Sequence, residues 1–182
     1  MTYPFIDLHT ACIVAGVLLL VSHGLAIIHG TGARAALQAF PRSRVMGVLL
    51  LLLAAAWSFA MIAKMDLGEF SNYRRPLLIV IPIATFLTLK FVDEFLAVRA
   101  LGMLLLLGAE PLLESAFLRP EMGRLLLVVL AYAWAVLGMY YVGTPYLLRD
   151  QISWLTKTPG RWLGAAVTGF AYGLALLAAG LI

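Results

Sequence analysis

The sequence predicts an all-α protein, a polytopic bundle of about six transmembrane helices with no sizeable soluble domain. Of its 182 residues, 63% are hydrophobic and 12% are charged, whereas soluble domains are roughly half apolar and a quarter charged. Runs such as VMGVLLLLLAAAW, residues 45–57, are apolar on every face of a helix, as expected of a segment surrounded by lipid. The alternating polarity of a transmembrane β-barrel is missing from these runs.

Six apolar segments approach the roughly 20 helical residues that cross about 30 Å of hydrocarbon. His9 and His29 flank the first, and the second ends at Lys64. The third begins at Pro76, which suits a first helical turn, and contains Pro82, which predicts a bend. The fifth ends in YYVGTPY, and the sixth reaches the end of the chain. The whole chain, 1–182, is predicted to form one integral membrane domain with spans at 10–28, 45–63, 76–92, 96–116, 124–142 and 162–182.

A cluster of charged side chains separates the third span from the fourth. It contains Lys90, Asp93, Glu94 and Arg99. Lysine and arginine can extend their stems to the membrane surface, and the aspartate and glutamate fall between the two predicted helices. The cluster is therefore predicted to be a turn at the membrane surface.

Glu110 is the stronger candidate for an ionisable group inside the bilayer. The stretch before it is too short to cross the membrane alone, so a spanning helix must include it. It lies 11 residues beyond Arg99, or about 16 Å along a helix, and is followed by Pro111. Glu114 shares its helix face, so the pair could bind a cation, pass a proton, or form ion pairs with Lys90 or Arg99. Alternatively, the helix is short or tilted and Glu110 lies among the headgroups.

The basic residues predict an orientation. With six spans, one set of connections carries eight lysines and arginines and the opposite set carries five. The positive-inside rule assigns the first set to the cytoplasm, which places both termini outside the cytoplasm of a bacterial-type inner membrane. MTYPFIDLHTA at the N-terminus has no basic residue, which argues against a cleaved signal peptide. The net charge of +4 indicates contact with anionic headgroups and not with nucleic acid.

Two histidines lie 14 residues apart on the first span. His9 and His23 share a helix face about 21 Å apart, and this spacing resembles that of the cytochrome b family, in which one helix ligates two b haems. That family carries the matching pair on a second helix, whereas His29 is the one other histidine of this chain. Haem b would then need a methionine, a second copy or a partner subunit as its other ligand. The alternative is that His9 is interfacial and His23 makes a polar helix contact.

Catalytic and metal-binding motifs are not found. Cys12 is the only cysteine, which excludes an intrachain disulfide and a cysteine zinc cluster. Ser22 and His23 are adjacent, so they point to different helix faces and do not form a nucleophile–base pair. No catalytic residue is therefore predicted, and a non-enzymatic role is favoured.

Small residues on the sixth span predict close helix packing. Ala165, Gly169 and Gly173 follow at four-residue steps, and such a stripe lets helices approach closely in lipid. The sequence therefore predicts a non-catalytic integral inner-membrane protein in contact with lipid, working as a homo-oligomer or as a subunit of a larger membrane complex. The alternatives are a small ion, proton or solute pathway through the carboxylates, and an electron-transfer subunit that binds b haem.

Overall fold

The fold is a set of helices joined by short connections. The structure is a computed structural model and describes residues 6–92 and 94–181; Asp93 of the predicted turn and Ile182 of the last predicted span lie outside them. Every regular element in the described residues is helical. These are α1 (Leu8–Ile28), α2 (Gly30–Ala39), η1 (Phe40–Arg42), α3 (Arg44–Lys64), η2 (Gly68–Tyr73), α4 (Arg74–Phe91), α5 (Leu96–Ala116), α6 (Gly123–Gly143), α7 (Tyr146–Thr156) and α8 (Pro159–Leu181).

Within residues 6–92 and 94–181, five helices are long and apolar enough to cross a membrane, which indicates a multi-pass membrane protein: α1, α3, α5, α6 and α8. The predicted span 76–92 is also helical, in α4, but this helix has 18 residues and includes Arg74, Arg75 and Lys90. The expected count of about six spans is therefore not confirmed, because three charges in so short a helix leave too little apolar length.

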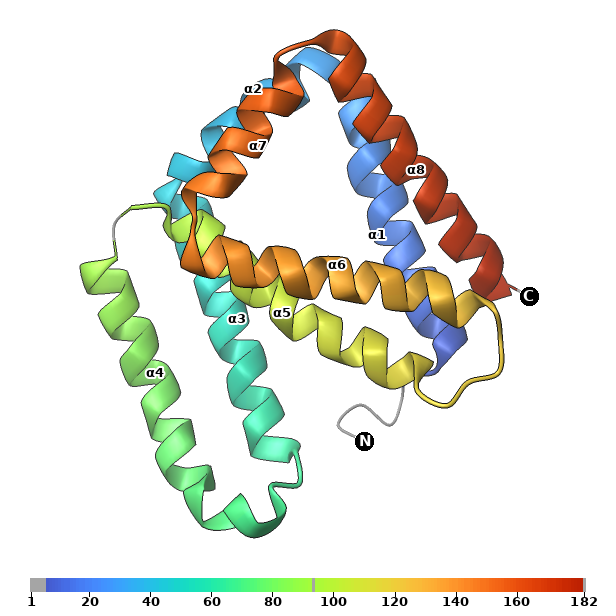
Figure 1. The fold of residues 1–182 in the computed structure, drawn as a ribbon. Helices are drawn as coiled ribbons and strands as arrows, with labels where there is room; N and C mark the ends of the chain where they lie inside the picture. Colours follow the sequence, from blue (N-terminus) through green and yellow to red (C-terminus); the bar gives the residue numbers. More distant parts are fainter. Residues whose placement is uncertain (1–5, 93, 182) are drawn as a thin grey trace.

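Two antiparallel helix pairs form the centre of the molecule (Figure 1). One pair consists of the first and last helices, α1 and α8, and the other of α5 and α6. The pairs meet at one end, in a buried cluster that includes Leu8 and Cys12 of α1, Leu127 of α6 and Leu176 of α8. Both described chain ends lie at this end of the molecule.

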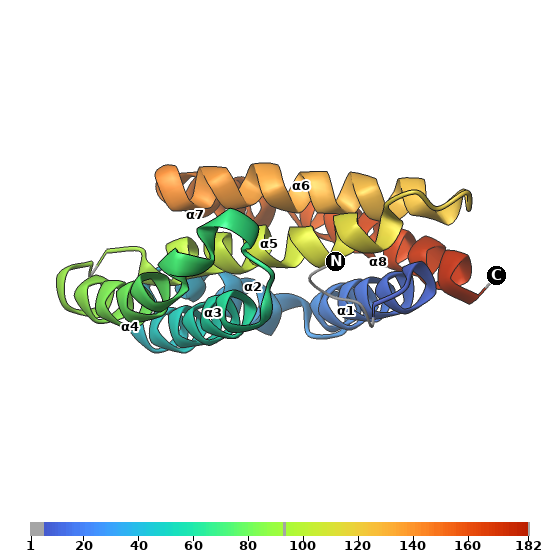
Figure 2. The ribbon, with the colours of Figure 1, turned by 90° about the horizontal axis from the view of Figure 1, so that it is seen from below.

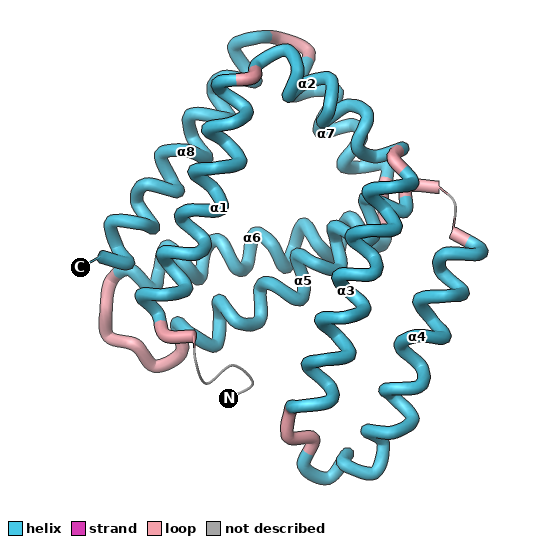
Figure 3. The backbone as a smooth tube through the Cα atoms, turned by 180° about the vertical axis from the view of Figure 1, so that it is seen from behind, coloured by secondary structure: helices cyan, strands magenta, loops and turns pink. Residues whose placement is uncertain are grey.

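At their other ends the two pairs diverge, and the short helices α2 and α7 bridge them (Figures 1 and 3). Gln38 of α2 donates a hydrogen bond from Nε2 to Oγ1 of Thr156 on α7, at 2.8 Å. Both helices are amphipathic, which is typical of helices lying at a membrane surface. Viewed from below, the helices form a thin slab with α6 at one face and α1, α3 and α4 towards the other (Figure 2).

The α3–α4 hairpin projects from this centre (Figure 1). α3 is anchored at its start, where Leu51 packs with Leu96 and Ala100 of α5. α4 runs back alongside α3 (Figure 3) and contributes no buried residue. The α4 side of the hairpin is therefore open to the surroundings along its whole length.

Helix ends follow local sequence signals. Asp7 caps α1 by accepting a hydrogen bond from the backbone N–H of Thr10 at 3.0 Å. Ser43 caps α3 by accepting one from Met46 at 3.3 Å. Such side chains satisfy backbone donors that lack a partner within the helix. α2 ends at Ala39 and continues into the 3₁₀ turn η1, which contains Pro41; proline lacks the backbone N–H that would extend the α-helical hydrogen bonds.

Candidate functional site

The predicted carboxylate pair lies in the second half of α5. Glu110 is half-buried and stands between Ala109 and Pro111, both of which are buried. It follows the first residue of α5 by 14 positions, which corresponds to about 21 Å along the axis. Glu114 is one turn further and is also half-buried. The depth of both groups in a bilayer, and the ion pathway that would use them, stay predictions.

The predicted basic partners lie towards the other end of α5. Arg99 is in its first turn and is half-buried. Lys90 is exposed at the end of α4, where its Nζ lies 5.5 Å from the centre of the Phe91 ring. The fold therefore gathers Lys90 and Arg99 where α4 ends and α5 begins, and separates them from Glu110 by about half the length of α5.

His23 is enclosed by its own helix and by α8. Its Nδ1 lies 2.9 Å from the carbonyl oxygen of Leu19 and 3.2 Å from Oγ of Ser22. A carbonyl oxygen only accepts hydrogen bonds, so Nδ1 carries the proton and donates it. Nε2 faces Gly169 of α8 so closely that a Cβ there would overlap the ring. This geometry favours His23 as a polar helix contact, since haem ligation through Nε2 would require α8 to move; haem binding at His9 and His23 stays a prediction.

The predicted small-residue stripe forms the contact between α8 and α1. A Cβ placed on Gly173 would lie 3.0 Å from the carbonyl oxygen of Gly16, so the two backbones are in van der Waals contact. Gly180 extends the contact and packs against the His9 carbonyl. Ala165, the first member of the predicted stripe, is exposed and borders a cavity.

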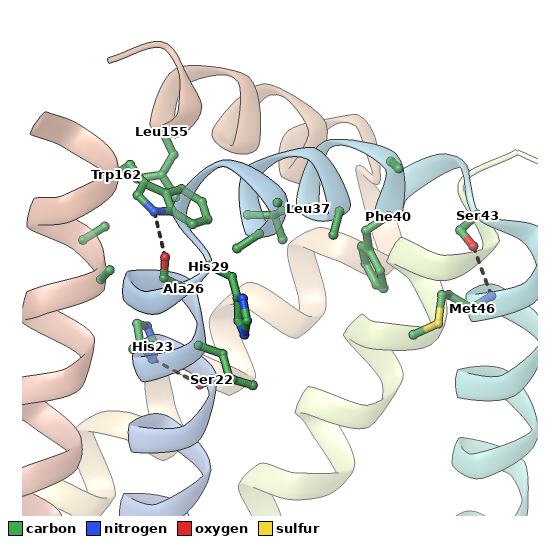
Figure 4. A pocket seen from close by; sticks show the side chains of 17 residues that line it. Ser22, His23, Ala26, His29, Leu37, Phe40, Ser43, Met46, Leu155 and Trp162 are labelled. Atoms are coloured by element: carbon green, nitrogen blue, oxygen red, sulfur yellow. Dashed lines mark hydrogen bonds between the residues drawn. The ribbon is translucent and has the colours of Figure 1, made fainter. Parts of the chain in front are cut away.

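This cavity is a second functional candidate in the described part of the chain. It has a volume of about 740 Å³ and lies between the end of α1, the underside of α2, and the starts of α3 and α8 (Figure 4). Its walls are mostly apolar, with a few polar side chains from α1 and α3. The side chains labelled in Figure 4 are Ser22, His23, Ala26, His29, Leu37, Phe40, Ser43, Met46, Leu155 and Trp162.

Trp162 fixes one wall of the cavity. Its Nε1 donates a hydrogen bond to the carbonyl oxygen of Ala26 at 3.1 Å and so joins the start of α8 to the end of α1. The guanidinium of Arg34 lies 5.5 Å from the centre of the Trp162 ring. His29, at the corner between α1 and α2, projects into the cavity (Figure 4).

The sequence does not predict this cavity, because the predicted spans 10–28 and 45–63 leave residues 30–44 as a connection between them. A helical signal was present there: Ala33, Ala36, Leu37 and Phe40 follow the spacing of one helix face and line the cavity. Glycines at positions 30 and 32 concealed that pattern, since glycine disfavours helix. His29 was identified only as a flanking residue.

Chemically, the site can hold an apolar molecule and offer it a small number of hydrogen bonds. Such a combination is typical of ligand pockets of roughly 300–1,000 Å³. No protein-family model, curated protein or solved structure matches this chain. The function is therefore inferred from the arrangement of its own side chains.

Proposed function

We propose that the protein is a six-crossing component of a bacterial-type inner membrane with a non-catalytic role, working as a homo-oligomer assembled through its α3–α4 hairpin. The observation that carries the proposal is an apolar groove of about 440 Å³ between α3 and α4. In lipid, helix–helix contacts are enriched in small residues, which let the two backbones approach closely. Ala55, Ala56 and Thr85 provide small side chains in this groove, among larger apolar ones such as Phe59 and Phe86. The small side chains support a helix as its occupant.

The same hairpin carries a face that could fill such a groove. Ile79, Ile83 and Leu87 follow at four-residue steps on α4, and their exposed fractions are 59%, 52% and 46%. In a two-fold dimer, if patch A of one copy contacts patch B of its partner, then patch B of the first copy also contacts patch A of the partner. We therefore propose that the exposed row on α4 of each copy packs into the α3–α4 groove of the other copy.

The course of the chain supports α4 as the sixth crossing. The start of α3 lies against the start of α5, since a Cβ on Gly47 would be 2.8 Å from the backbone nitrogen of Ala97. The chain must therefore return along α3 before α5 begins, and α4 makes this return. Its 18 residues extend about 27 Å, close to the hydrocarbon thickness of about 30 Å.

Six crossings also agree with the antiparallel α1–α8 pair, because both described chain ends then lie on one side of the membrane. The bridged end of the molecule, with α2 and α7, carries the larger set of basic residues, which supports a cytoplasmic location for it. That set is Arg34, Arg42, Arg44, Lys90, Arg99, Arg149, Lys157 and Arg161.

Crosslinking between differently tagged copies tests the oligomer. In a Cys12→Ala background, one copy carries Ala56→Cys in the groove and the other carries Ile83→Cys on the exposed row. We expect a disulfide-linked dimer containing both tags after mild oxidation of native membranes. Leu53→Cys, on α3 with an exposed fraction of 55% and outside the groove, is the matched control in place of Ala56→Cys and should give little dimer.

Two results would contradict the homo-oligomer. Equal yields from Ala56→Cys and Leu53→Cys would show random collision and not a specific contact. A crosslink from Ala56→Cys to an unrelated polypeptide, without a mixed-tag dimer, would favour instead the alternative that the chain is a subunit of a larger complex.

A further inference from the structure

We propose that the cavity between α1, α2 and α8 binds a lipid-soluble molecule with an uncharged, hydrogen-bond-accepting ring at one end and an apolar tail, the chemical class of the isoprenoid quinones. This site is separate from the α3–α4 groove, and its occupancy does not depend on oligomer formation.

The shape and the lining select an amphiphile that enters from the lipid. The volume of about 740 Å³ lies within the range of small-molecule sites, which is roughly 300–1,000 Å³. Phe40 and Trp162 contribute aromatic walls, and Leu37 and Met46 contribute aliphatic ones. A flat ring would pack against Trp162, near His29, while its tail continues past Leu37 and Phe40 towards Met46 (Figure 4).

His29 is the group that would recognise the head of the ligand. Its imidazole projects into the cavity (Figure 4), and a neutral imidazole offers one N–H donor and one acceptor. The neighbouring polar side chains are already engaged, because Oγ of Ser22 donates to the Leu19 carbonyl at 3.2 Å and Nδ1 of His23 lies 2.9 Å from the same oxygen. A ring carbonyl on the ligand would accept the hydrogen bond from His29.

The lining also indicates that the head is uncharged. Among the described residues that line the cavity, there is no aspartate, glutamate, lysine or arginine. Arg34 is close by, but its guanidinium lies over the Trp162 ring. A phosphate or carboxylate head inside the cavity would therefore lack a countercharge, and burying an unpaired charge is costly. A neutral quinone head carries no such cost.

Binding of decylubiquinone to the full-length protein tests the proposal. The protein is reconstituted in nanodiscs of synthetic phosphatidylcholine, which supply no quinone, and binding is followed by isothermal titration calorimetry. We expect saturable binding with one site per chain. His29→Leu should weaken it about three- to tenfold, the effect of one net hydrogen bond, whereas His9→Leu, a histidine outside the cavity, should leave it unchanged.

A second pair of variants tests the location independently of the hydrogen bond. Ala36→Trp places a large ring in the cavity and should abolish binding, while Ala35→Trp, on the exposed face of α2, should not. Decylbenzene, which has the same tail on a ring without carbonyls, tests the head. The proposal would be overturned if decylubiquinone showed no saturable binding, or if each variant and its matched control lost the same affinity for it. Equally tight binding of decylbenzene would also overturn it and would identify a site for adventitious lipid only.

Discussion

The distance between α1 and α8 is set by single atoms. At Gly16 and Gly173 each backbone lies where the side chain of the other residue would begin, and at Gly169 the ring of His23 occupies that place. Between helices in lipid, where apolar burial gains little, close backbone approach and the dispersion contacts it allows are a main source of stability. The glycines of α8 therefore stabilise the contact with α1 because they have no side chain to hold the two helices apart.

Gly173→Val is expected to destabilise the protein by about 1–3 kcal/mol, the usual cost of overpacking a close contact. Its Cβ would lie 3.0 Å from the Gly16 carbonyl oxygen, so α8 must shift away from α1. The measurement is unfolding by denaturant in detergent micelles. Gly164→Val is the control on the same helix, because nothing lies within 4 Å of a Cβ at Gly164; equal destabilisation by both variants would show that the effect comes from valine in a helix and not from the contact.

Asp7 gives the start of α1 a pH dependence. Hydrogen bonds from the Thr10 side chain and backbone N–H hold the pKa of this carboxyl below its ordinary value of 3.8. A group with a lowered pKa contributes its stability above the ordinary pKa and loses it as the pH falls through the lowered one. We expect the difference in stability between wild type and Asp7→Asn to be constant near neutral pH and to shrink in acid below pH 3.8.

The measurement for Asp7 is thermal unfolding in detergent from pH 7 down to the acid limit of the preparation. Because asparagine also caps helices but does not titrate, the comparison isolates the charge of Asp7 from that of the other carboxyls. A difference that stays the same across the whole pH range would contradict the assignment.

At the scale of the element, the sequence predicted the long helices well. The predicted spans 45–63 and 96–116 correspond to α3, Arg44–Lys64, and α5, Leu96–Ala116. In lipid the regular structures available are helices and closed barrels, and runs that are apolar on every face favour the helix. The short helices α2 and α7 were missed, since their mixed polar composition resembles that of a loop. The apolar side chains of these helices can be assigned to the lining of a cavity only after the fold is known.

The same limit applies to the candidate site. The α8 stripe followed from spacing alone, and the structure pairs Gly169 and Gly173 with His23 and Gly16. The sequence could not identify α1 as the helix that packs against this stripe, because any apolar helix could pack there. The cavity combines side chains from α1, α2, α3 and α8, and no local pattern records which distant helices come together.

Trp162 links two elements through one hydrogen bond, to the Ala26 carbonyl at 3.1 Å. Trp162→Phe keeps the aromatic ring and removes the donor, so we expect a loss of about 0.5–1.5 kcal/mol in the free energy of unfolding. Trp154→Phe is the control, because Trp154 is 60% exposed. If the two variants lose the same stability in detergent, the link between α8 and α1 is not the cause.

At the scale of the whole molecule, six crossings predict which connections share a side of the membrane. In the Cys12→Ala background, we expect Glu94→Cys and Lys157→Cys to react with an impermeant maleimide from the cytoplasmic side of oriented vesicles. Glu69→Cys, in η2, should react only from the opposite side. If Glu69→Cys and Glu94→Cys react from the same side, α4 does not cross and the topology is wrong.

The pairing of α1 with α8 has a consequence for synthesis. α1 is synthesised before its partner α8, so it must wait in the membrane while the 130 residues between the two helices, 29–158, are inserted. During that interval Ser22, His23 and the Gly16 backbone face lipid or the translocation machinery instead of α8. Chains interrupted before Pro159 would lack α8, and this polar, small-residue face of α1 would remain without the partner it packs against in the structure.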